Sequence, residues 1–152
     1  MIQRIQSVYL FLAGLIPALT FFTPIAKLQV RGGWLNISSA YYEAVNFPIV
    51  AGMMPWGITI ATLFLVLINI WNIFCYKNRK KQIKIANWSI ALSLLFYLAT
   101  ILHIILMISE TEASVKPTPV FFAPLLAMFF ILLARQAIKK DEALVRAADR
   151  IR

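Results

Sequence analysis

The sequence predicts an all-α fold: a four-transmembrane-helix up-down bundle with a cytoplasmic C-terminal helical extension and a small β-hairpin in the first outer loop. Hydrophobic residues make up 61% of the 152 residues, and charged residues make up only 14%. Soluble domains are about 45–50% apolar and about 25% charged. Because so little charge cannot cover so much apolar surface in water, lipid is the expected solvent. The basic residues also gather beside apolar segments, as they do at membrane boundaries.

Four apolar segments account for the predicted bundle. A helix rises 1.5 Å per residue, so about 20 residues cross the roughly 30 Å of hydrocarbon in a bilayer. The predicted spans are residues 5–23, 55–76, 85–108 and 119–135. An outer loop, residues 24–54, and a tail helix, residues 136–152, complete a single membrane domain.

Prolines mark features within these spans. Pro17 predicts a kink in the first helix, because its ring removes one backbone hydrogen bond. Thr118 followed by Pro119 predicts an N-cap and a first helical position for the fourth span.

The outer loop contains a hairpin signal. Residues 27–30 and 34–37 alternate polar and apolar side chains, and Gly32 and Gly33 stand between them. Glycine accepts the positive φ of a tight turn without steric cost. Because an isolated two-stranded hairpin is marginal in water, we expect it to lean on the bilayer surface or on a partner. Aromatic residues that follow predict an interfacial belt: Tyr41, Tyr42, Phe47 and Trp56.

The distribution of lysine and arginine predicts the orientation. Twelve of the 15 basic residues fall on one side of the predicted spans: Arg4, five between Lys77 and Lys84, and six from Arg135 onward. Since this bias sets topology, both termini and the middle loop are predicted in the cytoplasm. Eight of these residues are predicted to contact anionic lipid headgroups: Lys77, Arg79, Lys80, Lys81, Lys84, Arg135, Lys139 and Lys140. In neither basic cluster, residues 77–84 or the residues from Arg135 onward, do aromatic residues alternate with the basic ones, as they do in many nucleic-acid-binding proteins. No nucleic acid is therefore expected as a partner.

Polar residues recur along one side of the third predicted span. They are Ser89, Ser93, Tyr97, Thr100 and His103. One interpretation is a helix–helix seam, where small hydroxyls allow close approach. The alternative is a hydrated pathway or small-ligand site in which His103 titrates. A metal site needs three or four ligands, and no nucleophile, nucleotide or metalloprotease pattern occurs. We therefore expect no cofactor, no metal and no catalytic residues.

The predicted tail helix carries a narrow apolar stripe. Its members are Leu144, Ala147, Ala148 and Ile151. Such a stripe is typical of a helix that docks on a partner or lies on a membrane surface, whereas a solvated extension is the simpler alternative.

Three segments together resemble a known family. They are residues 1–6 (MIQRIQ), residues 77–80 (KNRK) and residues 140–152 (KDEALVRAADRIR). With them the chain resembles a family of small four-helix bacterial inner-membrane proteins of unknown function from Gram-negative bacteria. The resemblance implies a location in the inner (cytoplasmic) membrane and brings no activity with it.

The leading functional hypothesis is therefore a non-enzymatic accessory or scaffolding subunit of a membrane protein assembly, with a membrane-protein partner or a second copy of the chain. The alternative is a small oligomeric transporter or channel that uses the polar stripe of the third span. A membrane-bound enzyme is the third possibility, and it would need an outer-face pocket that the sequence does not indicate.

Overall fold

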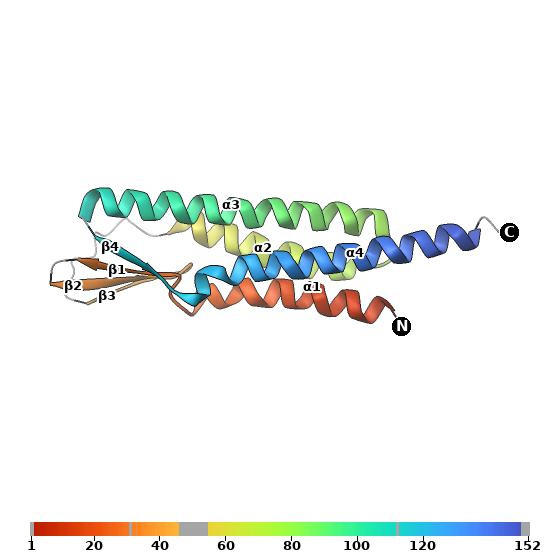
Figure 1. Cartoon of the computed structure of the whole chain (residues 1–152), viewed down its shortest axis with the longest axis horizontal. Helices are drawn as coiled ribbons and strands as arrows, with labels where there is room; N and C mark the ends of the chain where they lie inside the picture. Colours follow the sequence, from red (N-terminus) through yellow and green to blue (C-terminus); the bar gives the residue numbers. More distant parts are fainter. Residues whose placement is uncertain (1, 31, 46–54, 112, 150–152) are drawn as a thin grey trace.

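The computed structural model describes residues 2–30, 32–45, 55–111 and 113–149. Its elements, in chain order, are α1 (Ile2–Ala18), η1 (Leu19–Phe21), β1 (Ala26–Val30), β2 (Gly33–Ile37), β3 (Tyr42–Val45), α2 (Trp56–Phe74), α3 (Arg79–Thr111), β4 (Ser114–Pro117), η2 (Pro119–Phe122) and α4 (Ala123–Asp149). The four α-helices lie along the long axis of the molecule, and the strands lie at one end (Figure 1). We call this the sheet end. The opposite end, where α1 begins and α4 ends, is the terminal end.

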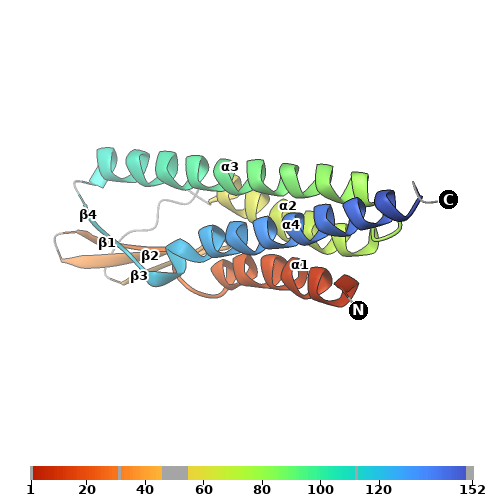
Figure 2. The ribbon, with the colours of Figure 1, turned by 45° about the vertical axis from the view of Figure 1, so that its right-hand side comes forward.

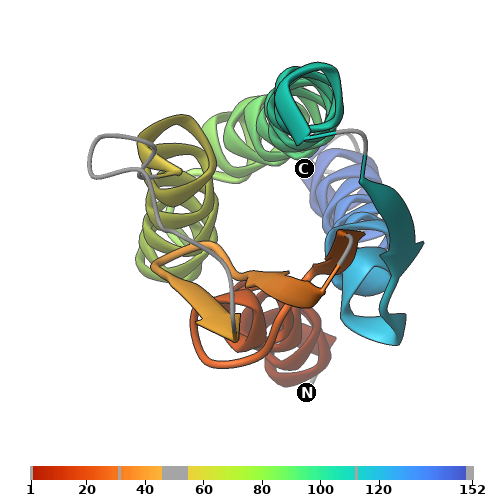
Figure 3. The ribbon, with the colours of Figure 1, turned by 90° about the vertical axis from the view of Figure 1, so that its left-hand side faces the viewer.

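The helices form a ring in which each contacts its neighbours in the sequence. α1 packs on α2, α2 on α3 and α3 on α4, and α4 closes the ring against α1. Figure 3, a view from the sheet end, shows this ring, and Figure 1 shows that successive helices run in opposite directions. The predicted helical fold with four main helices is confirmed.

Three of the helical segments in the described residues are long and apolar enough to cross a membrane. They are Trp56–Phe74, Arg79–Ser109 and Pro119–Val145. The segment Ile5–Phe21 is also apolar but shorter.

The start of α3 differs from the prediction. Residues 77–84 were expected to form a basic loop, but the helix begins at Arg79 and continues for 33 residues. The side-chain oxygen of Asn78 accepts the backbone N–H of Lys81 at 3.0 Å, which caps the first turn. Lysine, arginine and glutamine are good helix formers, so capping and propensity together extend the helix beyond its apolar part.

Both prolines lie close to helix boundaries. α1 ends at Ala18, one residue after Pro17, and passes into the 3₁₀ turn η1. Pro119 opens the 3₁₀ turn η2, and α4 begins only at Ala123. Thr118 stands at the predicted N-cap position, but it makes no capping hydrogen bond, and its hydroxyl donates to the carbonyl of Ile25 at 2.9 Å.

The outer loop forms part of an antiparallel four-stranded sheet with strand order β3-β2-β1-β4. The predicted hairpin is present as β1 and β2, with Leu28 opposite Leu35, and Gly32 adopts the positive φ of 93° that its turn requires. Two strands were not predicted. β3 pairs with β2, and β4, which was expected to be loop, pairs with β1 across more than 80 residues of sequence.

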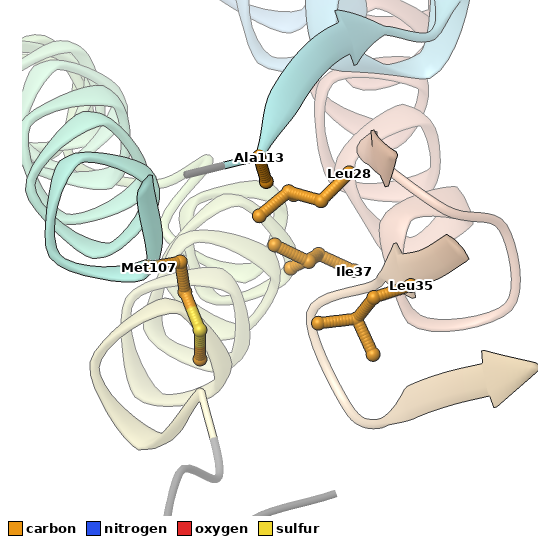
Figure 4. Packing of buried hydrophobic residues seen from close by; sticks show 5 residues of the cluster. All are labelled: Leu28, Leu35, Ile37, Met107 and Ala113. Atoms are coloured by element: carbon orange, nitrogen blue, oxygen red, sulfur yellow. The ribbon is translucent and has the colours of Figure 1, made fainter. Parts of the chain in front are cut away.

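One face of the sheet packs on the outer part of α3. Alternation along the strands directs Leu28, Leu35 and Ile37 to this face. They form a buried cluster with Met107 of α3 and with Ala113 (Figure 4). The β1–β2 hairpin is therefore supported by two additional strands and by α3.

Candidate functional site

The polar stripe of α3 faces the interior of the molecule. Ser89, Ser93 and Thr100 are buried, and each hydroxyl donates to a carbonyl four residues earlier in its own helix, at 2.8–3.2 Å. These hydroxyls thus satisfy their hydrogen bonds within α3, and their small size lets neighbouring helices approach.

Tyr97 links α3 to the beginning of α4. Its hydroxyl donates to the carbonyl of Phe121 at 2.9 Å and accepts the backbone N–H of Leu125 at 3.1 Å. The first amides of a helix have no partner within the helix, so the tyrosine supplies the cap that Thr118 does not. Its ring also packs edge-on against Phe96 and Phe121.

His103, the last member of the stripe, contacts the sheet. A hydrogen bond joins its Nε2 atom to the hydroxyl of Tyr42 in β3, and the two rings stack with centroids 5.8 Å apart. Burial raises the pKa of Tyr42, so its hydroxyl stays protonated at neutral pH. All five stripe residues therefore have hydrogen-bond partners within the protein.

A second polar cluster, not predicted, lies at the terminal end. The side-chain amide of Gln6 donates to a carboxylate oxygen of Asp141 at 2.7 Å. Arg79 donates to the backbone carbonyl of Asp141 at 3.3 Å, and Gln82 donates to that of Asn72 at 3.1 Å. All four helices thus contribute to this cluster. The feature of the sequence that could have indicated this cluster is the presence of glutamine side chains, Gln6 and Gln82, at the ends of apolar segments.

Some buried polar atoms have no hydrogen-bond partner in the described part of the chain. They include both polar atoms of the Asn72 side chain, Oδ1 of Asn69 and Nε of Arg135. The amide nitrogen of Asn69 does donate, to the carbonyl of Leu65 at 2.8 Å. These residues belong to α2 and α4, and buried unpaired polar groups are costly in an apolar surrounding.

The eight predicted headgroup-binding residues lie in the α2–α3 turn, in the first two turns of α3, and in the middle and second half of α4. Six are exposed: Lys77, Lys80, Lys81, Lys84, Lys139 and Lys140. Arg79 and Arg135 are half-buried. A groove of about 640 Å³ opens here between the α2–α3 turn and α4. It is lined by Tyr76, Lys77, Asn78, Arg79, Lys80, Glu142 and Val145.

The helix α4 extends beyond the bundle at the terminal end (Figure 2). It packs on the other helices as far as Asp141, since Ile138 and Asp141 are both buried. Beyond that point Leu144 is 55% exposed and Val145 is 45% exposed. Of the predicted docking stripe, Ala147 is exposed, Ala148 lies within α4, and Ile151 falls outside the described residues.

Exposed apolar side chains surround the bundle, and on α3 they continue further than elsewhere. Ala13, Ala86 and Ile131 pack together in one layer, and Asn69 reaches the same layer through the carbonyl of Ala13. This layer gives a common reference height for the four helices.

From this layer toward the sheet end, the helices differ in length. α3 rises about 33 Å from Ala86 to Ile108, whereas α2 rises about 20 Å from Asn69 to Trp56. Figure 1 shows the end of α3 lying alongside the sheet. We call residues 101–109 the outer segment of α3. Its exposed apolar residues are Ile101, Leu102, Ile105, Leu106 and Ile108.

The described residues contain no group of three or more histidine, cysteine, aspartate or glutamate side chains placed to hold a metal ion.

The chain was compared with curated proteins and with protein-family models. No curated protein matches the chain. A family model described as "Domain of unknown function (DUF4293)" matches residues 2–151, nearly the whole chain. This match confirms that the resemblance was to an uncharacterised family. The chain belongs to the DUF4293 family.

Proposed function

We propose that this chain is a bacterial inner-membrane protein that spans the bilayer four times, with both termini in the cytoplasm. It serves as a non-enzymatic accessory or scaffolding subunit that holds another membrane protein. The placement of charge supports this orientation. The basic residues of the α2–α3 turn and of α4 lie together at the terminal end, and lysine and arginine favour the cytoplasmic side.

The unequal heights of α2 and α3 support a partner. Toward the sheet end, α2 rises about 20 Å above the Ala13 layer and α3 rises about 33 Å, so α3 continues beyond the first residue of α2, Trp56. A membrane whose boundary lies at Trp56 leaves the outer segment of α3, with its exposed apolar side chains, outside the hydrocarbon. Large exposed apolar patches in water mark interaction sites, so we assign this segment to contact with another membrane protein.

The terminal end of the bundle offers a second surface on which a partner could dock. Leu144 and Val145 are exposed on the part of α4 that extends beyond the bundle. A projecting amphipathic helix is a common means of docking in a groove of another protein.

A transporter or channel is less well supported. The hydroxyls of the α3 stripe bond to carbonyls of the protein, and His103 bonds to Tyr42. A pathway would require these groups to face water, and a single four-helix bundle fills its own centre with side chains.

Site-specific photo-crosslinking in intact cells tests the partner. A crosslinker replaces Ile105 in the outer segment of α3 or, as the control, Leu67 in the middle of α2. These side chains are 56% and 52% exposed. Position 105 is expected to give a protein adduct and position 67 only lipid adducts. The absence of a protein adduct at position 105 would refute the assignment.

Deletion of the projecting tail tests the second surface. The deletion should remove residues 143–152 and leave Ile138 and Asp141, which are buried in the bundle. Co-purification of the partner in mild detergent is expected to weaken, while the melting temperature stays close to that of the full chain. Retention of the partner at full stoichiometry would show that the tail is dispensable.

Topology reporters provide an independent test of the membrane placement. Fusions after Lys80 and Arg152 are expected to report the cytoplasm, and fusions after Gly33 and Ala113 the opposite side. An extracytoplasmic signal at Lys80 would contradict the proposed orientation.

A further inference from the structure

The groove at the terminal end has the chemistry of an anion-binding site. Lys77, Arg79 and Lys80 line it with three formal positive charges, and Glu142 contributes one negative charge. The groove has a volume of about 640 Å³ and is open to its surroundings. The lining therefore carries a net positive charge in a concave surface, where field lines concentrate.

The groove is built on fixed elements. Arg79 is anchored on α4 through the carbonyl of Asp141 at 3.3 Å. The turn that supplies Lys77 is closed by a 3.0 Å hydrogen bond from the backbone N–H of Asn78 to the carbonyl of Cys75. The bond from Arg79 thus joins the two walls of the groove, the α2–α3 turn and α4.

The position of the groove indicates what its ligand carries. Tyr76 lines it, and Phe74, two residues earlier on α2, is among the most exposed apolar side chains of the protein. The exposed apolar surface of α2 therefore ends within two residues of the groove lining. A ligand with a phosphate and acyl chains would place the phosphate on the cations and its chains along the surface around Phe74.

We propose that this groove binds the phosphate of one anionic membrane lipid headgroup. The phosphate lies among Lys77, Arg79 and Lys80, and arginine and lysine are the preferred partners of phosphate oxygens. The proposal rests on the membrane placement proposed above but not on the protein partner. It differs from a general attraction between basic residues and the membrane, because it assigns lipid binding to the residues of one groove. Lysines at the same end of the molecule but outside the groove should not contribute.

A matched pair of double variants tests this distinction. K77Q/K80Q removes two cations that line the groove. K139Q/K140Q removes two exposed lysines of α4 at the same end of the molecule that are outside the groove lining. Arg79 is retained, because it also anchors α4. Circular dichroism and melting temperature establish that both variants fold.

Binding is measured by native mass spectrometry of the purified full chain in neutral detergent. The probes are short-chain phosphatidylglycerol, phosphatidylcholine with the same acyl chains, and inorganic phosphate. Phosphatidylglycerol is expected to bind more tightly than phosphatidylcholine. Each cation is expected to contribute about fivefold, so K77Q/K80Q should weaken phosphatidylglycerol binding by roughly 25-fold, whereas K139Q/K140Q should change it by less than about twofold.

Three outcomes would overturn the proposal. Equal losses in both variants would indicate diffuse attraction, and equal affinity for the two lipids would exclude charge recognition. Inorganic phosphate that binds as tightly as phosphatidylglycerol would assign the groove to a free anion. Failure here leaves the topology reporters and the crosslinks unaffected, so the two proposals can fail separately.

Discussion

The side-chain amide of Gln6 donates a 2.7 Å hydrogen bond to the carboxylate of Asp141, a residue 135 positions later in the chain. Gln6 is 5% exposed and Asp141 is 7% exposed. The backbone carbonyl of Asp141 also accepts a hydrogen bond from Arg79. One residue of α4 thus fastens the beginnings of α1 and α3, and this contact closes the bundle at the terminal end.

We expect Gln6→Ala to destabilise the protein by about 1–3 kcal/mol, because it leaves a buried carboxylate without its donor. Thermal unfolding of the purified chain in detergent measures the change. Gln136, which is exposed in the middle of α4, provides the control, and Gln136→Ala should change stability by less than about 0.5 kcal/mol. Equal effects of the two substitutions would contradict a role for the Gln6–Asp141 bond.

Asn72→Leu should be neutral or stabilising. Both polar atoms of the buried Asn72 side chain are without a partner in the described residues, and an apolar group of similar shape removes that cost. Asn69→Leu is the comparison, because it deletes the hydrogen bond to Leu65 and should destabilise by about 1 kcal/mol. The same unfolding measurement ranks the two variants. If Asn72→Leu proved the more damaging, the Asn72 amide would be hydrogen-bonded in the folded protein, for example to a buried water.

Tyr97→Phe should destabilise the protein by about 1–2 kcal/mol, since it removes one hydroxyl that serves the carbonyl of Phe121 and the amide of Leu125. The ring and its packing remain, so the loss reports the hydroxyl alone. Tyr76→Phe, at an exposed position in the turn after α2, is the control and should have little effect. A melting temperature unchanged by Tyr97→Phe would show that water or another group replaces the cap.

The sequence predicted the helices and the hairpin because their signals are local. Apolar runs define the helices, and alternation around Gly32 defines β1 and β2. β4 has no comparable signal: Ser114–Pro117 is short, and only its pairing with β1, far away in the sequence, makes it a strand. The start of α3 could not be predicted from the apolar pattern, because residues 79–84 are mostly charged. Lysine and arginine nevertheless favour helix.

For the candidate sites, too, local features could be predicted from the sequence and long-range contacts could not. The positions of the α3 stripe could be predicted from helical spacing, but the partner of each residue could not. His103 bonds to Tyr42, which had been assigned to an interfacial belt, and Tyr97 replaces Thr118 as the cap of α4. The Gln6–Asp141 bond depends on α4 returning to α1, a contact between the two ends of the chain. Such contacts follow from the closed ring of helices and have no signature in any single segment.

The Tyr42–His103 bond joins the sheet to α3, and its loss should loosen the sheet without unfolding the helices. We expect Tyr42→Phe to accelerate amide hydrogen exchange in β2 and β3, because the phenol is half-buried and His103 loses its partner. Tyr41→Phe is the control. It removes a 3.1 Å bond to the carbonyl of Phe22 at an exposed position where water can substitute, so its effect should be smaller.

A double-mutant cycle identifies the bond itself. His103→Ala should loosen the same strands, and the double variant should add little to either single change, since each substitution already removes the bond. Additive effects would mean that Tyr42 and His103 stabilise the sheet independently. If exchange in β2 and β3 were unchanged in Tyr42→Phe, the buried cluster of Leu28, Leu35, Ile37 and Met107 would suffice to hold the sheet on α3.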